Sequence, residues 1–565
     1  MHTTRIGLYT MRKSLIGVIL ALAIVVRGAP GLAQSPDDLP DRAAFEQFQA
    51  ILDGGALSPA AVAELLVFDD TPEMRLELAR LSVEQGQHSL ALDLLGDMNA
   101  ILPLEAALRT QVLDLLIEAY MRLGNVSEAI EMAFLAYEAA VQRLGDENPA
   151  LLPRLLVLRD LVKGSADLPV IEAEIAALEA RLAAPEGVRQ IGKPHALPVW
   201  FGTNRNDTGV SDPAARFGVE LSDLSLGQLT VTIPQSHRPG RIERPALWGL
   251  TQHLDPMQHV VLAQIEALAK EAFSTDCCGA EDRLLFIHGY NVSFHDGALR
   301  AAQLAHDLEF PGQALYYSWP SRGTLLSYLQ DANNVLATRP ALAEFLEIVT
   351  RGTGRLHVIA HSMGNRYLLE ALDVFLRDFP DRELGHIVLG APDVDRNEMQ
   401  VRLDLISKRA RSVSLYASRN DRALLVSRRI HGAPRAGDST GEPLRLAGLF
   451  TLDASEIVAD VLGHSYFGDS PLVLGDLAGL LRLDMEPDIR CGTRERAAPV
   501  WDIRTDGCPV DHVLAAAEFH DRYQAQAPTE LARRIAEAEQ TEQAFWLSVM
   551  EIVTENLGNA TAPAE

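Results

Sequence analysis

The segment V-I-A-H-S-M-G-N-R places one serine, Ser362, between a run of apolar residues and a helix-like pattern. Small residues, Ala360 and Gly364, stand two positions to either side of it. Where a strand turns sharply into a helix, the central residue takes strained backbone angles, and these neighbours must be small so that chain segments can cross. The spacing therefore fits a nucleophile exposed at a strand end. It also fits an ordinary strand-to-helix connection.

A serine hydroxyl needs a base to remove its proton and a carboxylate to hold that base. Further along the chain, Asp421 follows the strand-like segment S-V-S-L-Y-A-S. His464 lies in G-H-S-Y-F, after a last strand-like segment L-F-T-L-D-A-S. The order is then Ser362, Asp421, His464. Asp393, in A-P-D-V-D-R after the preceding strand, is the alternative acid, and His464 could instead be a solvent-exposed loop residue.

Negative charge that develops on a reacting carbonyl oxygen needs backbone N–H donors to hold it. We expect one from Met363, which follows the candidate nucleophile. We expect the other from Tyr290, because F-I-H-G-Y-N ends a strand with a sharp turn at His288 and Gly289. We interpret His288 and His361 as structural histidines. Such a reaction requires no metal or organic cofactor, and no cysteine spacing suggests a zinc site.

Short apolar strands alternate with helical patterns in the second part of the chain. Strands are expected at 199–205, 228–234, 283–291, 314–320, 355–362, 386–392 and 412–418, and helices at 296–309 and 364–377. This alternation predicts an α/β fold, a mostly parallel sheet covered by helices on both faces. Active residues then belong at the carboxyl ends of the strands.

Six segments together are more specific than the serine motif alone: H-G-Y-N, Y-Y-S-W-P-S, V-I-A-H-S-M-G-N-R, A-P-D-V-D, Y-A-S-R-N-D-R-A-L and G-H-S-Y-F. They resemble a bacterial α/β-hydrolase family of uncharacterised function, distantly similar to lipases and esterases, over roughly residues 196–470. The resemblance implies an α/β-hydrolase fold and a serine hydrolase with Ser362, Asp421 and His464 as its triad. Ala360 departs from the usual glycine, and the resemblance supplies no substrate.

Residues 41–185 are rich in Ala, Leu and Glu and have helical periodicity. Two similar stretches centre on Gly86 and Gly124, and each glycine is followed five residues later by an alanine, Ala91 or Ala129. The pattern resembles tetratricopeptide repeats. An ordinary helical bundle is the alternative. Either arrangement predicts a binding or packing module that offers a surface to a protein partner.

The N-terminus has the pattern of a targeting segment. Arg12 and Lys13 precede the apolar run at 15–26, and small residues follow it. A helix needs about 20 residues to span a bilayer, so we expect a cleaved signal peptide over 1–34 rather than an uncleaved anchor. This predicts a periplasmic or secreted protein with no stable membrane insertion after cleavage. The net charge of −27 argues against nucleic acid as a partner.

The cysteines fall into two pairs along the chain: Cys277 with Cys278, and Cys491 with Cys508. An exported protein can form disulfides. The second pair lies in a loop-like stretch and could bond, whereas the adjacent first pair is not expected to form an ordinary bridge. Residues 471–565 are expected to be a C-terminal extension, irregular at first and ending in one helix at about 529–555.

Two classes of function remain at this point. The leading hypothesis is an exported serine hydrolase that cleaves carboxylic esters through an acyl-enzyme. Thioesters, amides and acyl transfer fit the same residues. The alternative is a non-catalytic or weakly active binding protein that engages an envelope partner through the helical repeats. A hybrid, in which the repeats recruit the substrate, is a third hypothesis.

Overall fold

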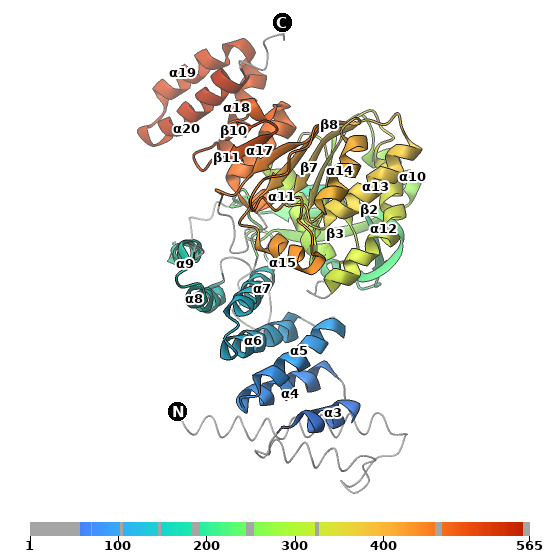
Figure 1. Ribbon diagram of the computed structural model, residues 1–565. Helices are drawn as coiled ribbons and strands as arrows, with labels where there is room; N and C mark the ends of the chain where they lie inside the picture. The colour runs from blue at the N-terminus through green and yellow to red at the C-terminus, as the bar shows by residue number, and fades with distance from the viewer. Residues whose placement is uncertain are drawn as a thin grey trace. The chain divides into compact units, whose positions relative to one another are not determined.

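The computed structural model describes residues 57–68, 71–101, 106–144, 148–165, 168–183, 193–244, 254–321, 327–457 and 466–557 (Figure 1). The predicted signal peptide and His464 lie outside these residues. The chain divides into two compact units. The first comprises Met1–Arg143 and Pro153–Leu168, and the second Leu144–Leu152 and Pro169–Glu565.

The described part of the first unit is helical. Its helices are α3 (Pro59–Phe68), α4 (Pro72–Glu84), α5 (His88–Ile101), α6 (Ala106–Arg122), α7 (Val126–Leu144) and α8 (Leu152–Leu161). Gly86 and Gly124 have φ of 77° and 79°, the left-handed conformation that lets a helix end in a tight turn. Ala91 and Ala129 are fully buried. The two glycine turns are therefore present, and their assignment to tetratricopeptide repeats stays a prediction.

The second unit is built on one sheet of 11 strands. The strands are β1 (His195–Asp207), β2 (Phe217–Ile233), β3 (Val261–Leu268), β4 (Arg283–Ile287), β5 (Gln313–Ser318), β6 (Leu356–His361), β7 (Leu384–Gly390), β8 (Ala410–Ala417), β9 (Phe450–Asp453), β10 (Thr493–Ala497) and β11 (Val500–Ile503). Their order is β10-β11-β9-β8-β7-β6-β4-β5-β1-β2-β3. The eight neighbouring strands β11-β9-β8-β7-β6-β4-β5-β1 pair in parallel. At one edge β10 pairs antiparallel with β11, and at the other β2 pairs antiparallel with β1 and β3 with β2. The predicted mostly parallel sheet is confirmed.

Helices cover both faces of this sheet. They are α10 (Lys270–Cys277), α11 (Phe294–Asp307), α12 (Ser327–Val349), α13 (Gly364–Asp378), α14 (Arg396–Ile406), α15 (Arg422–His431), α16 (Tyr466–Asp469), α17 (Pro471–Leu483), α18 (Val510–Tyr523), α19 (Ala527–Glu537) and α20 (Gln540–Glu551). The second unit also contains most of α9 (Leu168–Ala183). Ile359 of β6 joins the core that α11, α17 and α18 cover, whereas Val358 and Ala360 join the core under α12, α13 and α14. Successive strand residues point to opposite faces, so one apolar run serves two cores.

The chain beyond residue 470 continues the sheet rather than forming a separate, irregular extension. The strands β10 and β11 add to it beside β9, and α17 packs into one of its cores. The predicted single terminal helix is two helices, α19 and α20, which lie side by side (Figure 1). The break falls at Ala538, which has extended backbone angles. Within the described residues, no helix is both long enough and apolar enough to cross a membrane.

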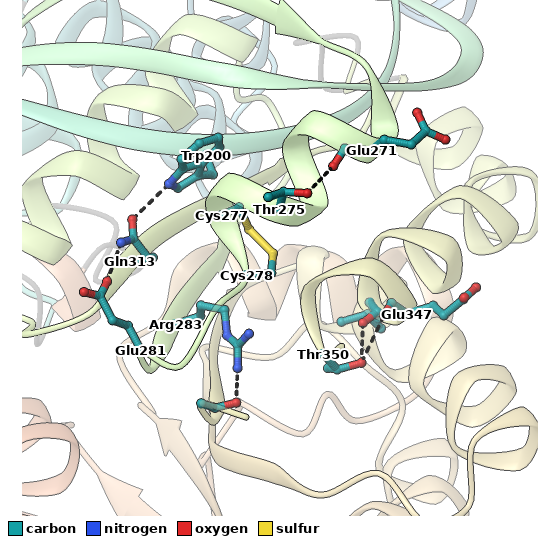
Figure 2. The surroundings of a disulfide bond; sticks show 12 residues. Trp200, Glu271, Thr275, Cys277, Cys278, Glu281, Arg283, Gln313, Glu347 and Thr350 are labelled. Carbon is teal, nitrogen blue, oxygen red and sulfur yellow. Dashed lines mark hydrogen bonds between the residues drawn. A yellow bond between two sulfur atoms is a disulfide. The ribbon is translucent and has the colours of Figure 1, made fainter. Parts of the chain in front are cut away.

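The prediction for the cysteines is half right. Cys491 and Cys508 are bonded, as expected. Cys277 and Cys278 are bonded to each other, which is a correction (Figure 2). The helix α10 ends at Cys277, and Cys278 leaves it with non-helical backbone angles, so the adjacent side chains meet. Both are buried in the core beneath α12.

Candidate active site

The turn between β6 and α13 has the predicted sharp geometry. Ser362 has a φ of 51°, in the left-handed region that non-glycine residues seldom enter. Its N–H donates to the Gly390 carbonyl at 2.9 Å, at the end of β7, and its carbonyl accepts from the Asn365 N–H at 3.2 Å. These bonds hold the strained backbone in place. The Ser362 hydroxyl makes no hydrogen bond with any residue that the structure describes.

The small residues around Ser362 are required by close approach of two chain segments. A Cβ on Gly364 would lie 2.4 Å from the His288 carbonyl oxygen. A Cβ on Gly289 would lie 3.0 Å from the Cβ of Ser362. The loop that follows β4 therefore touches the Ser362 turn directly. Tyr290, the next residue, begins the connection to α11 from this contact.

The buried side chain of His288 stabilises this loop. It is fully buried, its Nδ1–H donates to the Gly289 carbonyl at 2.7 Å, and its ring stacks on Trp319 with centroids 4.9 Å apart. Burial, with help from the nearby Arg205 cation, lowers the pKa of His288 to about 3. The ring is therefore neutral, and its contacts fit the structural role expected of it.

Sequence reasoning missed Arg205, which lies on β1 and is 1% exposed. Its guanidinium donates to the Val292 carbonyl at 2.8 Å, in the loop after β4. It also donates to the Ser318 hydroxyl at 2.8 Å and to the Ser321 carbonyl at 3.3 Å, around the end of β5. One buried cation thus ties together two loops at the carboxyl edge. The only hint in the sequence was a charged residue at the end of an apolar strand.

Both candidate oxyanion donors lie beside Ser362. Met363 directly follows it and begins the first turn of α13, where backbone N–H groups carry partial positive charge. Tyr290 directly follows Gly289, which touches Ser362. The Met363 side chain is buried, and that of Tyr290 packs against the same core. The loop that carries the Tyr290 amide therefore adjoins the turn that carries the Met363 amide.

The two candidate acids have different surroundings. Asp421 follows β8, is 1% exposed and accepts from the Leu424 N–H at 3.0 Å at the start of α15. Asp393 follows β7, and its carboxylate accepts from Arg435 Nε at 2.6 Å and from the Ser427 hydroxyl at 2.5 Å. The charge of Asp393 is therefore balanced by a buried guanidinium.

His464 lies outside the described residues, which resume two positions later at Tyr466. The Phe467 ring stacks on the His361 ring with centroids 4.5 Å apart, beside Ser362. The Tyr466 hydroxyl donates to the Tyr416 carbonyl on β8 at 2.8 Å. The chain just after His464 therefore contacts both β6 and β8, the strands that precede Ser362 and Asp421.

Comparison with known proteins agrees with the α/β fold. Residues 266–482 match a family described as "Alpha/beta hydrolase of unknown function (DUF900)". The resemblance is to an α/β-hydrolase. The matched residues run from β3 to α17 and include the Ser362 turn. The match supports the α/β fold and indicates hydrolase chemistry, and its description names no substrate.

A second similarity is more local. The chain is 29% identical over 113 residues to a Nostoc protein described as "Uncharacterized protein alr1448". The alignment covers 15% of this chain and 29% of that protein. The chain therefore matches less than a third of its relative's length.

Proposed function

We propose that the protein is a serine hydrolase that cleaves carboxylic esters, with Ser362 as nucleophile, His464 as base and Asp421 as the acid that orients it. The observation that carries this proposal is the positive φ of 51° at Ser362, between a central strand and a helix. Such a conformation costs about 1–2 kcal/mol for an L-residue. A strained, buried turn at the carboxyl edge of a parallel sheet, whose hydroxyl makes no hydrogen bond with the described residues, is typical of a catalytic serine.

The reaction follows from these roles. The Ser362 oxygen attacks the ester carbonyl carbon while His464 takes its proton. The N–H groups of Met363 and Tyr290 stabilise the oxyanion. His464 then protonates the departing alkoxide, which leaves as an alcohol. Water, activated by His464, hydrolyses the acyl-enzyme, releases a carboxylic acid and restores Ser362.

Two observations support Asp421 and His464 as the acid and base that act with Ser362. Asp393 is paired with a buried arginine, so Asp421 is the better candidate to stabilise an imidazolium. His464 precedes Tyr466 by two residues, and two residues span at most about 7 Å. Tyr466 is fixed to the backbone of β8, and Phe467 to the neighbour of Ser362. The short distance that two residues can span therefore supports the placement of His464 at the carboxyl edge of the sheet, near Ser362.

The export of the protein, its periplasmic or secreted location and a partner for the helical repeats belong to the same proposal. An ester in the cell envelope is the substrate class that unites them. Thioesters and amides would use the same machinery. If the hydrolase unit were inactive, the repeats would make the protein a binding module.

The test compares purified wild type with Ser362→Ala, using a fluorophosphonate probe and p-nitrophenyl esters from acetyl to decanoyl. We expect labelling and turnover in the wild type and neither in Ser362→Ala. Ser407→Ala, at the end of α14, is the matched control and should behave as wild type. Absence of labelling in folded wild-type protein would contradict the proposal and favour the binding module.

A further inference from the structure

A cluster of two histidines and one aspartate lies away from the Ser362 turn. His237, His306 and Asp307 each offer a ligand atom, and these atoms all lie within 4.8 Å of one another. His237 comes from the loop after β2, and the other two from the last turn of α11. Because α11 starts at the carboxyl end of β4 and runs back along the sheet, this cluster belongs to the opposite edge.

His237 is oriented as a metal ligand would be. Its Nδ1 is 2.8 Å from the Glu243 carboxylate, and its Nε2 is 2.7 Å from Asp307 Oδ1. Metal-binding histidines usually direct their second ring nitrogen at a carboxylate in this way. The side chains of His237 and Asp307 are only 4% and 1% exposed. The pair is thus a built, buried arrangement.

His306 is the third residue of the set, and its ring packs against that of His237. Its centroid is 5.2 Å from that of His237, edge to face. Its side chain makes no hydrogen bond with any residue in the described part of the chain. An imidazole held beside a carboxylate and a second imidazole, with no hydrogen-bond partner of its own there, is a group for which a ligand would supply the partner.

A cavity of about 310 Å³ opens onto the cluster. Its walls are His237, His306 and Asp307 on one side and α18 on the other, where Asp511 and Glu518 contribute carboxylates. The space is larger than one water needs, which is about 30 Å³ of liquid volume. A water could therefore take an open coordination position there.

We propose that His237 Nε2, a ring nitrogen of His306 and Asp307 Oδ1 bind one divalent transition metal ion, with Zn²⁺ the best fit. Two imidazoles and one carboxylate leave the fourth position of a tetrahedral ion to water from the cavity. Mg²⁺ and Ca²⁺ prefer all-oxygen ligands, so the nitrogens favour Zn²⁺. The ion replaces a proton between His237 and Asp307, which leaves to solvent.

The ligand atoms of the three residues must draw together from separations of up to 4.8 Å, and the pair of His237 and Asp307 requires the smallest adjustment. Ligand atoms about 2.0–2.1 Å from a tetrahedral zinc lie about 3.3 Å apart. His237 Nε2 and Asp307 Oδ1 are now 2.7 Å apart, as a hydrogen-bonded pair. A separation of roughly half an ångström, within the freedom of two side chains, turns that pair into two ligands.

The site would hold α16 in place. Asp307 Oδ2 accepts from the Gly240 N–H at 2.6 Å and also from the Gln303 amide. That amide lies 3.4 Å from the Gly468 carbonyl oxygen of α16. A Cβ on Gly240 would meet the Asp469 carbonyl oxygen at 2.2 Å, so this loop and α16 are in direct contact. The metal would therefore stabilise the helix that carries Phe467.

The test uses tag-free wild type treated with a chelator and dialysed, then titrated calorimetrically with Zn²⁺ and with Mg²⁺. We expect one equivalent of Zn²⁺ to bind, no Mg²⁺ binding, and a blue Co²⁺ derivative typical of tetrahedral nitrogen and oxygen ligands. His306→Ala should weaken Zn²⁺ binding by about 100-fold or more. It should still fold, because its ring makes no hydrogen bond with the described residues.

His195→Ala is the matched control. His195 is exposed, and its ring centroid is 5.5 Å from that of His306, outside the ligand set. It should bind Zn²⁺ as wild type does. Asp307→Asn is the second test variant and should also lose binding. Absence of stoichiometric Zn²⁺ binding, or equal loss in His195→Ala, would overturn the site. Ser362→Ala should bind normally, so the outcome is independent of esterase activity.

Discussion

The strain at Ser362 can be measured apart from its chemistry. Alanine and glycine both remove the hydroxyl, but only glycine occupies a φ of 51° without steric cost. That gain of about 1–2 kcal/mol exceeds the extra entropy glycine adds to the unfolded chain, about 0.4–1 kcal/mol. Ser362→Gly should therefore be more stable than Ser362→Ala by about 0.5–1 kcal/mol in denaturant unfolding. Equal stability, or a more stable alanine variant, would show that the turn is unstrained.

Substitutions of the two candidate acids, Asp421 and Asp393, should affect turnover and stability differently. Asp421→Asn keeps an N-cap side chain, since asparagine caps helices as well as aspartate, yet it cannot stabilise an imidazolium. We expect kcat for p-nitrophenyl esters to fall by about 1,000-fold or more, with little change in Tm. Asp393→Asn leaves Arg435 as an uncompensated buried charge, which costs about 3–5 kcal/mol.

Asp421→Asn should therefore lose turnover but keep its stability, and Asp393→Asn should do the reverse. Asp393→Asn is expected to lower the free energy of unfolding while the folded fraction keeps most of its turnover. If Asp393→Asn abolished turnover in folded protein and Asp421→Asn did not, the acid assignment would be reversed.

His288 should make the fold sensitive to acid. Its pKa is lowered from 6.5 to about 3 in the folded state, so below pH 6.5 the unfolded chain binds a proton that the folded chain does not. Stability therefore falls as the pH drops from 6.5 towards 3, by about 2–3 kcal/mol over the first two pH units. His288→Asn removes this titration and should flatten the decline. His195→Asn, at an exposed histidine, should leave it in place.

At the scale of elements, the two disulfides should differ in what they contribute. Cys491 and Cys508 are 17 positions apart and join the segment before β10 to the start of α18. Closing a loop of about 15 residues stabilises a fold by about 3 kcal/mol in the chain-entropy model. Replacing both by alanine should lower the free energy of unfolding by about that amount.

The bond between Cys277 and Cys278 is the matched control, because adjacent residues enclose almost no chain. The double alanine variant there should cost clearly less than the first pair. Comparing both variants with wild type by denaturant unfolding checks the difference. Equal losses would show that local packing, rather than loop closure, sets the contribution of each bond.

The elements that the sequence predicted best are those with a simple hydrophobic pattern. β6 and α13 follow from an apolar run and a helical period, and the sharp turn at Ser362 follows from the small residues around it. β10 was missed because an edge strand exposes one side, and T-R-E-R-A has no apolar run. The pairing of Asp393 with Arg435 joins residues 42 positions apart, which no local pattern encodes.

Parts of the candidate site were beyond sequence reasoning for the same reason. Arg205 acts through carbonyl groups of two distant loops, and those contacts exist only after the strands have assembled. The His237 cluster depends on the last turn of α11 meeting the loop after β2. The adjacent Cys277 and Cys278 required the backbone of a helix end. In each case the missing information is a contact between segments.

At the scale of the whole molecule, the division into two compact units predicts two unfolding transitions in calorimetry. Two glycine variants assign them. Gly124, in the first unit, has a φ of 79° and open space around it, so Gly124→Ala should cost about 1 kcal/mol through its backbone alone. Gly364→Ala, in the second unit, would place a Cβ 2.4 Å from the His288 carbonyl oxygen and should cost about 2 kcal/mol or more.

Each variant should lower the Tm of one transition and leave the other within error of wild type. Additivity is expected because the two substituted residues lie in separate compact units. The double variant should then show both shifts at their single-variant sizes. If either glycine variant moved both transitions together, the two units would unfold as one cooperative body, and the helical unit would have to be treated as part of the α/β fold rather than as a separate module.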